Sequence, residues 1–182
     1  MTRAEEDRTA QTQSLYDKKV AQAQRLHEAV RQLRGRLLNS MSVIDVSIAR
    51  LLATYFCQHE QRRDLAFSDV FVRLNSKTTL LEKVVKKSLP SEFIRENWPN
   101  VFSDLKELRD FRNTLAHATI DVSDEALAKG PDVEVGFVHF KNGERHVDRI
   151  TPQIANDYEV KANMVHTCLI ELGRVMGVTL PT

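Results

Sequence analysis

The chain is poor in the residues that mark several common classes of protein. It has two cysteines, one tryptophan, six glycines and five prolines among 182 residues. Cys57 and Cys168 lie far apart and show no metal-ligand spacing, which disfavours a disulfide-rich secreted fold and a zinc site. We interpret both as reduced core residues. The N-terminus is charged and polar, without the apolar segment of a secretory signal, so we expect a cytoplasmic protein.

Long apolar runs and a strong net charge are also missing. The most apolar stretch, residues 43–57, is interrupted by Asp45 and Arg50 and is judged too short to span a bilayer, so no membrane partner is expected. The formal net charge of +1 gives no whole-chain argument for nucleic-acid binding, and any such site must be a local patch. Basic residues do gather within residues 17–36. We interpret this run as solvated helix faces in preference to an RNA-binding track. The basic residues are Lys18, Lys19, Arg25, Arg31, Arg34 and Arg36.

The sequence motifs of several large enzyme classes are absent. We find no Gly-rich phosphate loop, no His-Glu-x-x-His, no Cys-x-x-Cys and no nucleophile elbow. These absences disfavour nucleotide-driven motors, zinc hydrolases and serine hydrolases. We therefore expect neither a cofactor nor a metal ion.

What the chain does contain is a succession of helical patterns. With 42% hydrophobic and 28% charged residues, it has the composition of one soluble domain, expected at 14–177 between a frayed polar segment 1–13 and a tail 178–182. Apolar residues recur in steps of three and four early in the chain, which predicts one long helix, or two if Gly35 interrupts it. This apolar seam faces the core or a second protomer. It consists of Leu26, Val30, Leu33, Leu37, Met41, Ile44, Ile48, Leu51 and Tyr55.

Helix-capping and turn residues predict the remaining elements after an ambiguous segment at 62–75. Asn142-Gly143 between two strand-like runs is the strongest short-range signal of a β-hairpin, expected at about 133–150. The fold class predicted is mainly α: an antiparallel bundle of four to six helices with one inserted hairpin. Further helices are expected at 76–87 (with Ser76 as N-cap), 91–97, 100–119 and 123–129, and from Thr151-Pro152 to about residue 177.

Candidate chemistry is concentrated in the run Arg-Asn-Thr-Leu-Ala-His at residues 112–117. Arg112 can bind a phosphate through two parallel hydrogen bonds, Asn113 can orient or donate, and His117 can transfer protons near neutral pH. On a helical wheel, Lys106, Asp110, Asn113 and His117 lie on one polar face, with Arg109 and Arg112 at its edges. The opposite face is apolar and consists of Val101, Leu105, Leu108, Phe111, Leu115 and Ala118.

This run resembles the Arg-x4-His motif of the HEPN superfamily, all-helical domains that include many metal-independent endoribonucleases. The resemblance implies a homodimer whose two motifs share one catalytic cleft and leave 2′,3′-cyclic phosphate and 5′-hydroxyl ends. It assigns phosphate binding to Arg112, proton transfer to His117, and orientation of the imidazole or phosphate binding to Asn113. From position alone we add Asp110, which could fix the His117 tautomer, with Arg109 and Lys106 as supporting residues. Such proteins often act as toxins or in defence against phage, held in check by an inhibitory protein partner.

Two other functional classes remain open at this point. One is a catalytically silent HEPN-like dimer that binds a nucleotide, nucleic acid or a protein partner. The other is a structural bundle that assembles through the apolar seam. Elsewhere, the hairpin register predicts His139 opposite His146 with Asp148 on the same face, a pair that we interpret as incidental rather than as a metal site. We interpret His27, His59 and His166 as structural.

Overall fold

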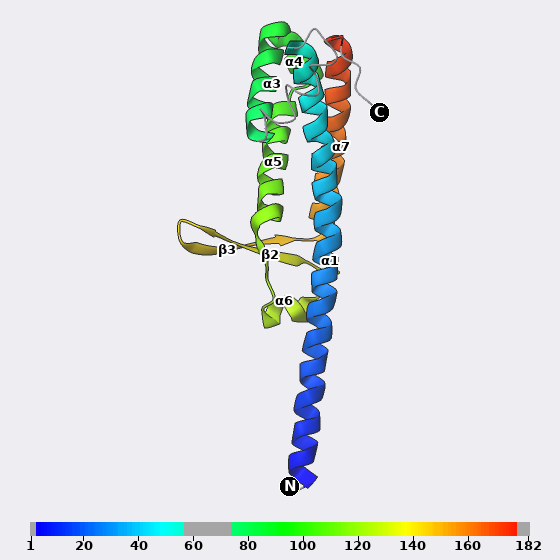
Figure 1. Ribbon diagram of the computed structural model, residues 1–182, viewed down its shortest axis with the longest axis vertical. Coiled ribbons are helices and arrows are strands. Elements are labelled where there is room, and N and C mark those ends of the chain that lie inside the picture. Colours follow the sequence, from blue (N-terminus) through cyan, green and yellow to red (C-terminus); the bar gives the residue numbers. More distant parts are fainter. Residues whose placement is uncertain (1–2, 57–73, 178–182) are drawn as a thin grey trace. The chain divides into compact units, whose positions relative to one another are not determined.

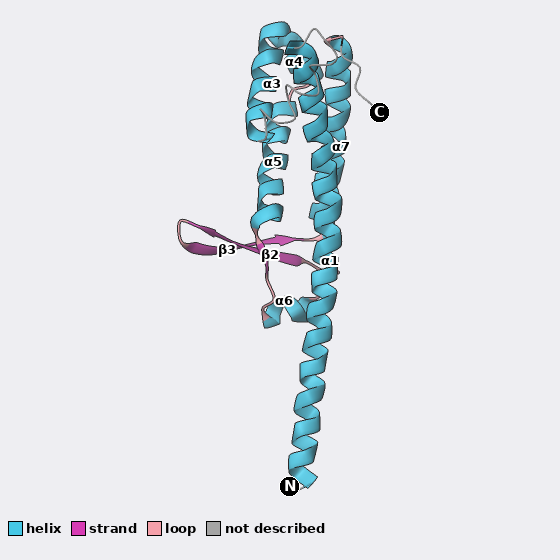
Figure 2. Ribbon diagram, viewed as in Figure 1, coloured by secondary structure: helices cyan, strands magenta, loops and turns pink. Residues whose placement is uncertain are grey.

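Helices dominate the protein, as expected from the sequence, and a small antiparallel sheet accompanies them (Figure 2). A computed structural model describes residues 3–56 and 74–177. Within these residues, six helices and three strands follow one another from α1 to α7 (Figure 1). Much of the segment predicted as ambiguous, and both Cys57 and His59, lie outside the described residues.

The chain divides into two compact units, and the expectation of a single domain at 14–177 stays a prediction. Unit 1 comprises Met1–Arg36 and Thr114–Asn156, and unit 2 comprises Leu37–Asn113 and Asp157–Thr182. Each unit is therefore built from two separate stretches of chain. The division falls inside α1, α5 and α7, so these three helices contribute residues to both units.

Helix α1 (Arg3–Phe56) is one continuous helix, which decides between the two alternatives left open by Gly35. It begins at Arg3, inside the segment for which fraying is predicted, so the helical conformation reaches further toward the N-terminus than the apolar seam does. The physical reason is composition: residues 3–13 are rich in Ala, Glu, Gln and Arg, which favour helices without needing an apolar face. Most of the predicted seam is buried, including Leu26, Val30, Leu37, Met41, Ile44, Ile48 and Leu51, while Tyr55 is exposed.

Length and apolar composition alone would let the segment Ala10–Phe56 of α1 cross a membrane, in contrast to the judgement made from residues 43–57. In the structure, 44% of its most apolar window is buried inside the protein. Core helices of soluble proteins meet the same criterion, so the observation does not decide where the protein resides.

In unit 2, helices pack around one apolar core. Its helical elements are the second part of α1, α3 (Leu74–Ser88), α4 (Ser91–Asn97), α5 (Val101–His117) up to Asn113, and α7 (Pro152–Val175) from Asp157. Helix α3 begins two residues before the predicted N-cap Ser76. The best-buried apolar side chains of the unit 2 core include Ile44, Ile48, Leu51, Leu52, Leu81, Leu105, Leu108 and Leu169.

One ion pair lies beside this core. The Lys77 side chain is only 8% exposed, and its Nζ is 2.9 Å from Oδ1 of Asp45, whose side chain is 36% exposed. A buried ammonium is costly unless it is paired, so Asp45 offsets part of the cost of burying Lys77.

In unit 1, three strands form an antiparallel sheet in the order β1-β2-β3. The hairpin of β2 (Val135–Lys141) and β3 (Glu144–Ile150) has the predicted turn, with φ of 54° at Asn142 and 83° at Gly143. Both residues have the positive φ that a two-residue type I′ turn requires. Within unit 1, the hairpin turn points away from the part of α1 that ends at Arg36 (Figure 1).

Strand β1 (Thr119–Ile120) was not predicted and pairs with Val138 and Phe137 of β2. Two residues carry no alternating pattern, so only the partner strand defines this element. Helix α6 (Asp124–Lys129) follows, at the position predicted for a helix over 123–129. It is capped by Ser123, whose side chain accepts a hydrogen bond from the Ala126 amide at 3.4 Å.

Between β1 and α6 the chain passes very close to β2. The Asp121 amide donates to the Gly136 carbonyl at 2.9 Å, and Asp121 is only 5% exposed. Its carboxylate accepts from the Ser123 amide and from Arg145, each at 3.2 Å. A glycine at position 136 leaves the space that this approach requires, as a Cβ there would lie 2.7 Å from Cβ of Asp121.

Candidate functional site

Helix α5 carries the candidate motif and is shorter than predicted. It begins after Asn100, whose carbonyl accepts from the Asp104 amide at 2.8 Å and from the Ser103 hydroxyl at 2.7 Å. It ends at His117, because Thr119 joins β1 instead of continuing the helix. His117 is thus the last residue of the helix, at the end that carries partial negative charge.

The two faces of α5 have the burial that the helical wheel predicts. Val101, Leu105, Leu108, Leu115 and the following Ala118 are between 1% and 7% exposed. Phe111 is half-buried. The four residues of the predicted polar face are all exposed: Lys106, Asp110, Asn113 and His117. The four polar side chains are therefore accessible to solvent in the described chain.

The three motif residues occupy the last turns of this helix. Asn113 and His117 are exposed, and Arg112 is half-buried at the edge of the polar face. The Arg112 guanidinium donates from Nη1 to Oδ1 of Asn113 at 3.3 Å. Asn113 and His117 are four residues apart, a spacing that puts two side chains on the same side of a helix. Arg112 and Asn113 belong to unit 2 and His117 to unit 1.

Among the supporting residues, Arg109 and Asp110 form a pair with each other. Oδ1 of Asp110 accepts from Nε and Nη2 of Arg109 at 2.9 and 2.7 Å. The Arg109 side chain is 17% exposed against 58% for Asp110, so the carboxylate lies on the outer side of the pair. The role suggested for Asp110 beside the His117 imidazole stays a prediction. Lys106 is exposed one turn earlier.

Aromatic and ionic contacts hold α5 against α7 next to the motif. The Phe111 ring stacks on Tyr158 with centroids 3.5 Å apart and an angle of 5° between the planes. Lys161 donates to Glu107 at 2.6 Å, and this hydrogen bond raises the pKa of Lys161. Both contacts lie within unit 2. The stacking fixes the orientation of α5 at Phe111, the residue directly before Arg112.

The predicted histidine pair on the hairpin is present. His139 and His146 lie opposite each other, with ring centroids 5.6 Å apart and an angle of 17° between the planes. Nδ1 of His139 is 3.5 Å from a carboxylate oxygen of Asp148. Among residues 3–56 and 74–177, no three His, Cys, Asp or Glu side chains are placed so that they could hold a metal ion together. The histidine pair with Asp148 is therefore not such a group.

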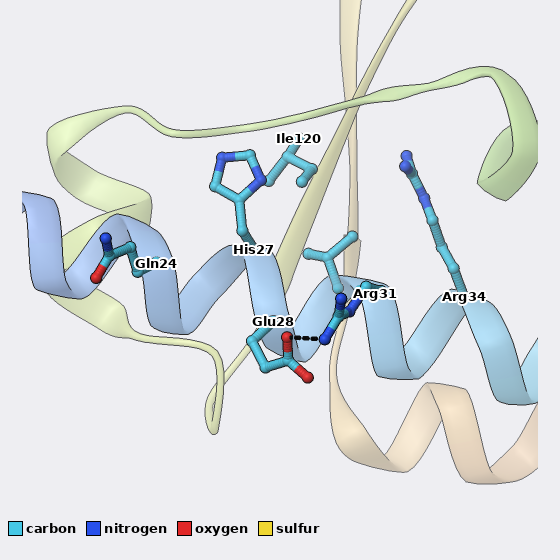
Figure 3. Close-up of a pocket in the computed structure, with 7 residues that line it drawn as sticks. Gln24, His27, Glu28, Arg31, Arg34 and Ile120 are labelled. Carbon is cyan, nitrogen blue, oxygen red and sulfur yellow. Dashed lines mark ion pairs between the residues drawn. The ribbon is translucent and has the colours of Figure 1, made fainter.

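The sequence interpretation missed a groove along the N-terminal part of α1. His27, interpreted as structural, is instead exposed and lines this groove with two of the early basic residues, Arg31 and Arg34 (Figure 3). The 27/31/34 spacing was the available signal, since it places three cationic or titratable side chains on one stripe of a helix. What the sequence could not supply is the opposite wall, to which Ile120 contributes.

Comparisons of the chain with protein-family models, with curated protein sequences and with solved structures gave no significant match. The class established here is therefore a structural one, a mainly helical protein with a small antiparallel sheet. The exposed polar face of α5, with the chemistry of its side chains, is the candidate functional site.

Proposed function

We propose that this protein is a metal-independent endoribonuclease of the HEPN type, with Arg112, Asn113 and His117 as its catalytic residues. The observation that carries the proposal is the exposure of Asn113 and His117 on one helix, with the Arg112 guanidinium hydrogen-bonded to Asn113. The finer fold assignment, an antiparallel HEPN-like bundle with an inserted hairpin, belongs to the same proposal.

The reaction suits these side chains. The ribose 2′-hydroxyl attacks the adjacent phosphorus, a new P–O bond forms, and the bond to the 5′-oxygen of the next nucleotide breaks. A base takes the 2′-hydroxyl proton, an acid protonates the departing 5′-oxygen, and a cation stabilises the charge on phosphorus. Arg112 would hold the phosphate, Asn113 would bind it or orient the imidazole, and His117 would transfer the protons.

A homodimer is part of this proposal for a geometric reason. In an in-line displacement the attacking and departing oxygens lie on opposite sides of the phosphorus, and one imidazole cannot readily serve both. Two motif helices brought together by a two-fold axis would supply one His117 to each side. The dimer, a cytoplasmic location, and a role as a toxin or anti-phage effector under an inhibitory partner are expectations from the family resemblance.

The test is RNA cleavage by the purified protein in EDTA, with identification of the product ends. Wild type should leave 2′,3′-cyclic phosphate and 5′-hydroxyl ends. His117→Ala should lower kcat by about 100-fold or more, the usual contribution of acid–base catalysis. Arg112→Ala should do the same, whereas Arg95→Ala, an exposed arginine on α4, serves as the matched control and should keep full activity.

The thermal unfolding midpoint separates catalysis from folding. His117 is exposed, so His117→Ala should change the free energy of unfolding by no more than about 0.5 kcal/mol. Cleavage that survives both motif substitutions, or that stops in EDTA, would overturn the mechanism. RNA that binds in an Arg112-dependent manner but is never cleaved would instead support the silent, ligand-binding alternative.

A further inference from the structure

An open groove of about 490 Å³ runs along α1 within unit 1 (Figure 3). Its apolar lining residues are Ile120, which is half-buried, and Val30, which is only 1% exposed, and the remaining lining residues are polar or charged. The full lining consists of Gln24, His27, Glu28, Val30, Arg31, Arg34 and Ile120. All of them belong to the same unit, so the groove is defined independently of unit 2.

Three of these side chains form a stripe that can attract anions. His27, Arg31 and Arg34 are spaced by four and three residues, which puts them along one side of the helix over about 10 Å of its axis. Figure 3 shows His27 and Arg34 extending from α1 on the same side as Ile120. A stripe of this length exceeds the size of one phosphate group and suits a run of phosphates.

The charges of this stripe are only partly neutralised. Arg31 is 2.6 Å from Glu28, the one carboxylate in the groove lining, and this contact lowers the pKa of Glu28. Arg34 instead donates to the Ala118 carbonyl and lies over the Phe137 ring at 5.1 Å. Neither partner of Arg34 carries a negative charge, so neither of them neutralises the positive charge of its half-buried guanidinium.

The groove adjoins the end of the motif helix. Ala118, the acceptor of the Arg34 hydrogen bond, directly follows His117, and Ile120 of the groove wall is two residues further on. These residues and the lining residues of α1 all lie in unit 1. A polymer held in the groove would therefore pass close to the backbone at His117.

We propose that this groove binds the sugar–phosphate backbone of single-stranded RNA next to the phosphate that is cleaved. Its choice of ligand rests on the proposed ribonuclease function. Arg31 and Arg34 contact phosphate oxygens, for which the planar guanidinium is suited, and His27 contributes a further donor. Ile120, which is half-buried, supplies apolar surface for ribose or base, which a site for a small inorganic anion does not need. Because the contacts are to the backbone, binding is largely independent of RNA sequence.

The experiment measures binding of a fluorescein-labelled oligouridylate of about a dozen nucleotides to the full chain carrying His117→Ala, which prevents cleavage. In this background Arg31→Gln should weaken binding several-fold. It should also reduce the slope of log Kd against log salt by about 0.7, the value for one lost single-strand phosphate contact. Arg25→Gln, an exposed arginine on the same helix that does not line the groove, is the matched control and should change neither quantity.

His27→Gln provides a second variant with little risk to folding, because His27 is exposed. It should weaken binding without lowering the thermal midpoint. Arg34 is left unchanged in these variants because its bond to Ala118 also supports the fold. Equal affinities for the Arg31→Gln, His27→Gln and Arg25→Gln proteins would overturn the proposal. The proposal would also be overturned if uridine monophosphate displaced the oligonucleotide at concentrations near the Kd of the oligonucleotide, since the ligand would then be a free nucleotide.

Failure of this proposal can be told apart from failure of the ribonuclease function. If wild type cleaves RNA and the groove variants leave KM unchanged, only the groove proposal is lost. If wild type does not cleave but Arg31→Gln still weakens RNA binding relative to Arg25→Gln, the groove proposal stands and the catalytic one is lost.

Discussion

Replacing Gly136 by alanine should destabilise the protein, because β2 and the chain at Asp121 approach too closely for a side chain. A Cβ at position 136 would lie 2.7 Å from Cβ of Asp121, 3.3 Å from its Oδ2 and 3.4 Å from Cγ1 of Val147. The atom at 2.7 Å is attached directly to the backbone and cannot rotate away. The hydrogen bond from the Asp121 amide to the Gly136 carbonyl, 2.9 Å long, opposes separation of the two segments.

The expected size of the effect follows from two opposing contributions. Overpacking of this kind costs about 1–3 kcal/mol. Loss of the glycine's freedom in the unfolded chain returns about 0.5–1 kcal/mol. Because a 2.7 Å contact falls at the costly end of the overpacking range, about 2–3 kcal/mol, the net loss in free energy of unfolding should be about 1–2.5 kcal/mol. This loss lowers the thermal midpoint by roughly 2–10 °C in a protein of this size.

Gly35→Ala is the matched control, measured by circular dichroism during thermal and urea unfolding. Gly35 lies inside α1, and apart from its chain neighbours and the backbone of the helix itself nothing comes within 4 Å of the position of its missing Cβ. The same substitution should therefore stabilise the protein there by about 0.5–1 kcal/mol. The double variant Asp121→Gly with Gly136→Ala removes the offending atom and should show favourable coupling of about 1 kcal/mol. A Gly136→Ala protein as stable as wild type would refute the reasoning.

Three further predictions concern the core and its titratable groups. Phe137 is fully buried, so Phe137→Ala should cost about 3–5 kcal/mol in urea unfolding, and a cost below about 1 kcal/mol would contradict its placement. Asp45→Ala should lower the free energy of unfolding by about 3 kcal/mol, because it leaves the buried ammonium of Lys77 unpaired. Lys77→Met should lower it clearly less, and the reverse order in the same urea assay would argue against the pair. Burial raises the pKa of the Cys168 thiol, so less of it is thiolate at a given pH. Alkylation of Cys168 by iodoacetamide at pH 8.5, followed by mass spectrometry, should be several-fold slower in the folded than in the urea-unfolded protein. The alkylation rate of the folded protein should keep rising above pH 9. Equal rates in the folded and unfolded proteins would exclude this effect of burial.

Elements with their own local signals were predictable from the sequence. Asn142-Gly143 fixed the hairpin turn, and its register followed from the turn, including the facing pair of His139 and His146. Ser123 and Thr151 mark the starts of α6 and α7 through side-chain hydrogen bonds to amides three residues later. In each case the information lies within a few residues of the element.

Elements defined by distant partners were not predictable in the same way. Strand β1 exists because β2 is beside it, and the groove exists because Ile120 lies opposite the stripe on α1. The polar and apolar faces of α5 could be assigned from spacing alone, since burial follows helical periodicity. Whether its polar face meets a second copy depends on contacts that no pattern within one helix encodes.

The order of segments in unit 1 has a consequence for synthesis of the chain. Its first stretch ends at Arg36 and its second begins at Thr114, so the 77 residues from 37 to 113 lie between them. At about 5–20 residues per second, a ribosome needs roughly 4–16 s to make that interval. During this time Leu26 and Val30, each 1% exposed in the finished protein, have yet to meet most of the residues that bury them. The newly made helix therefore presents an apolar surface to chaperones and to other nascent chains until the hairpin is complete.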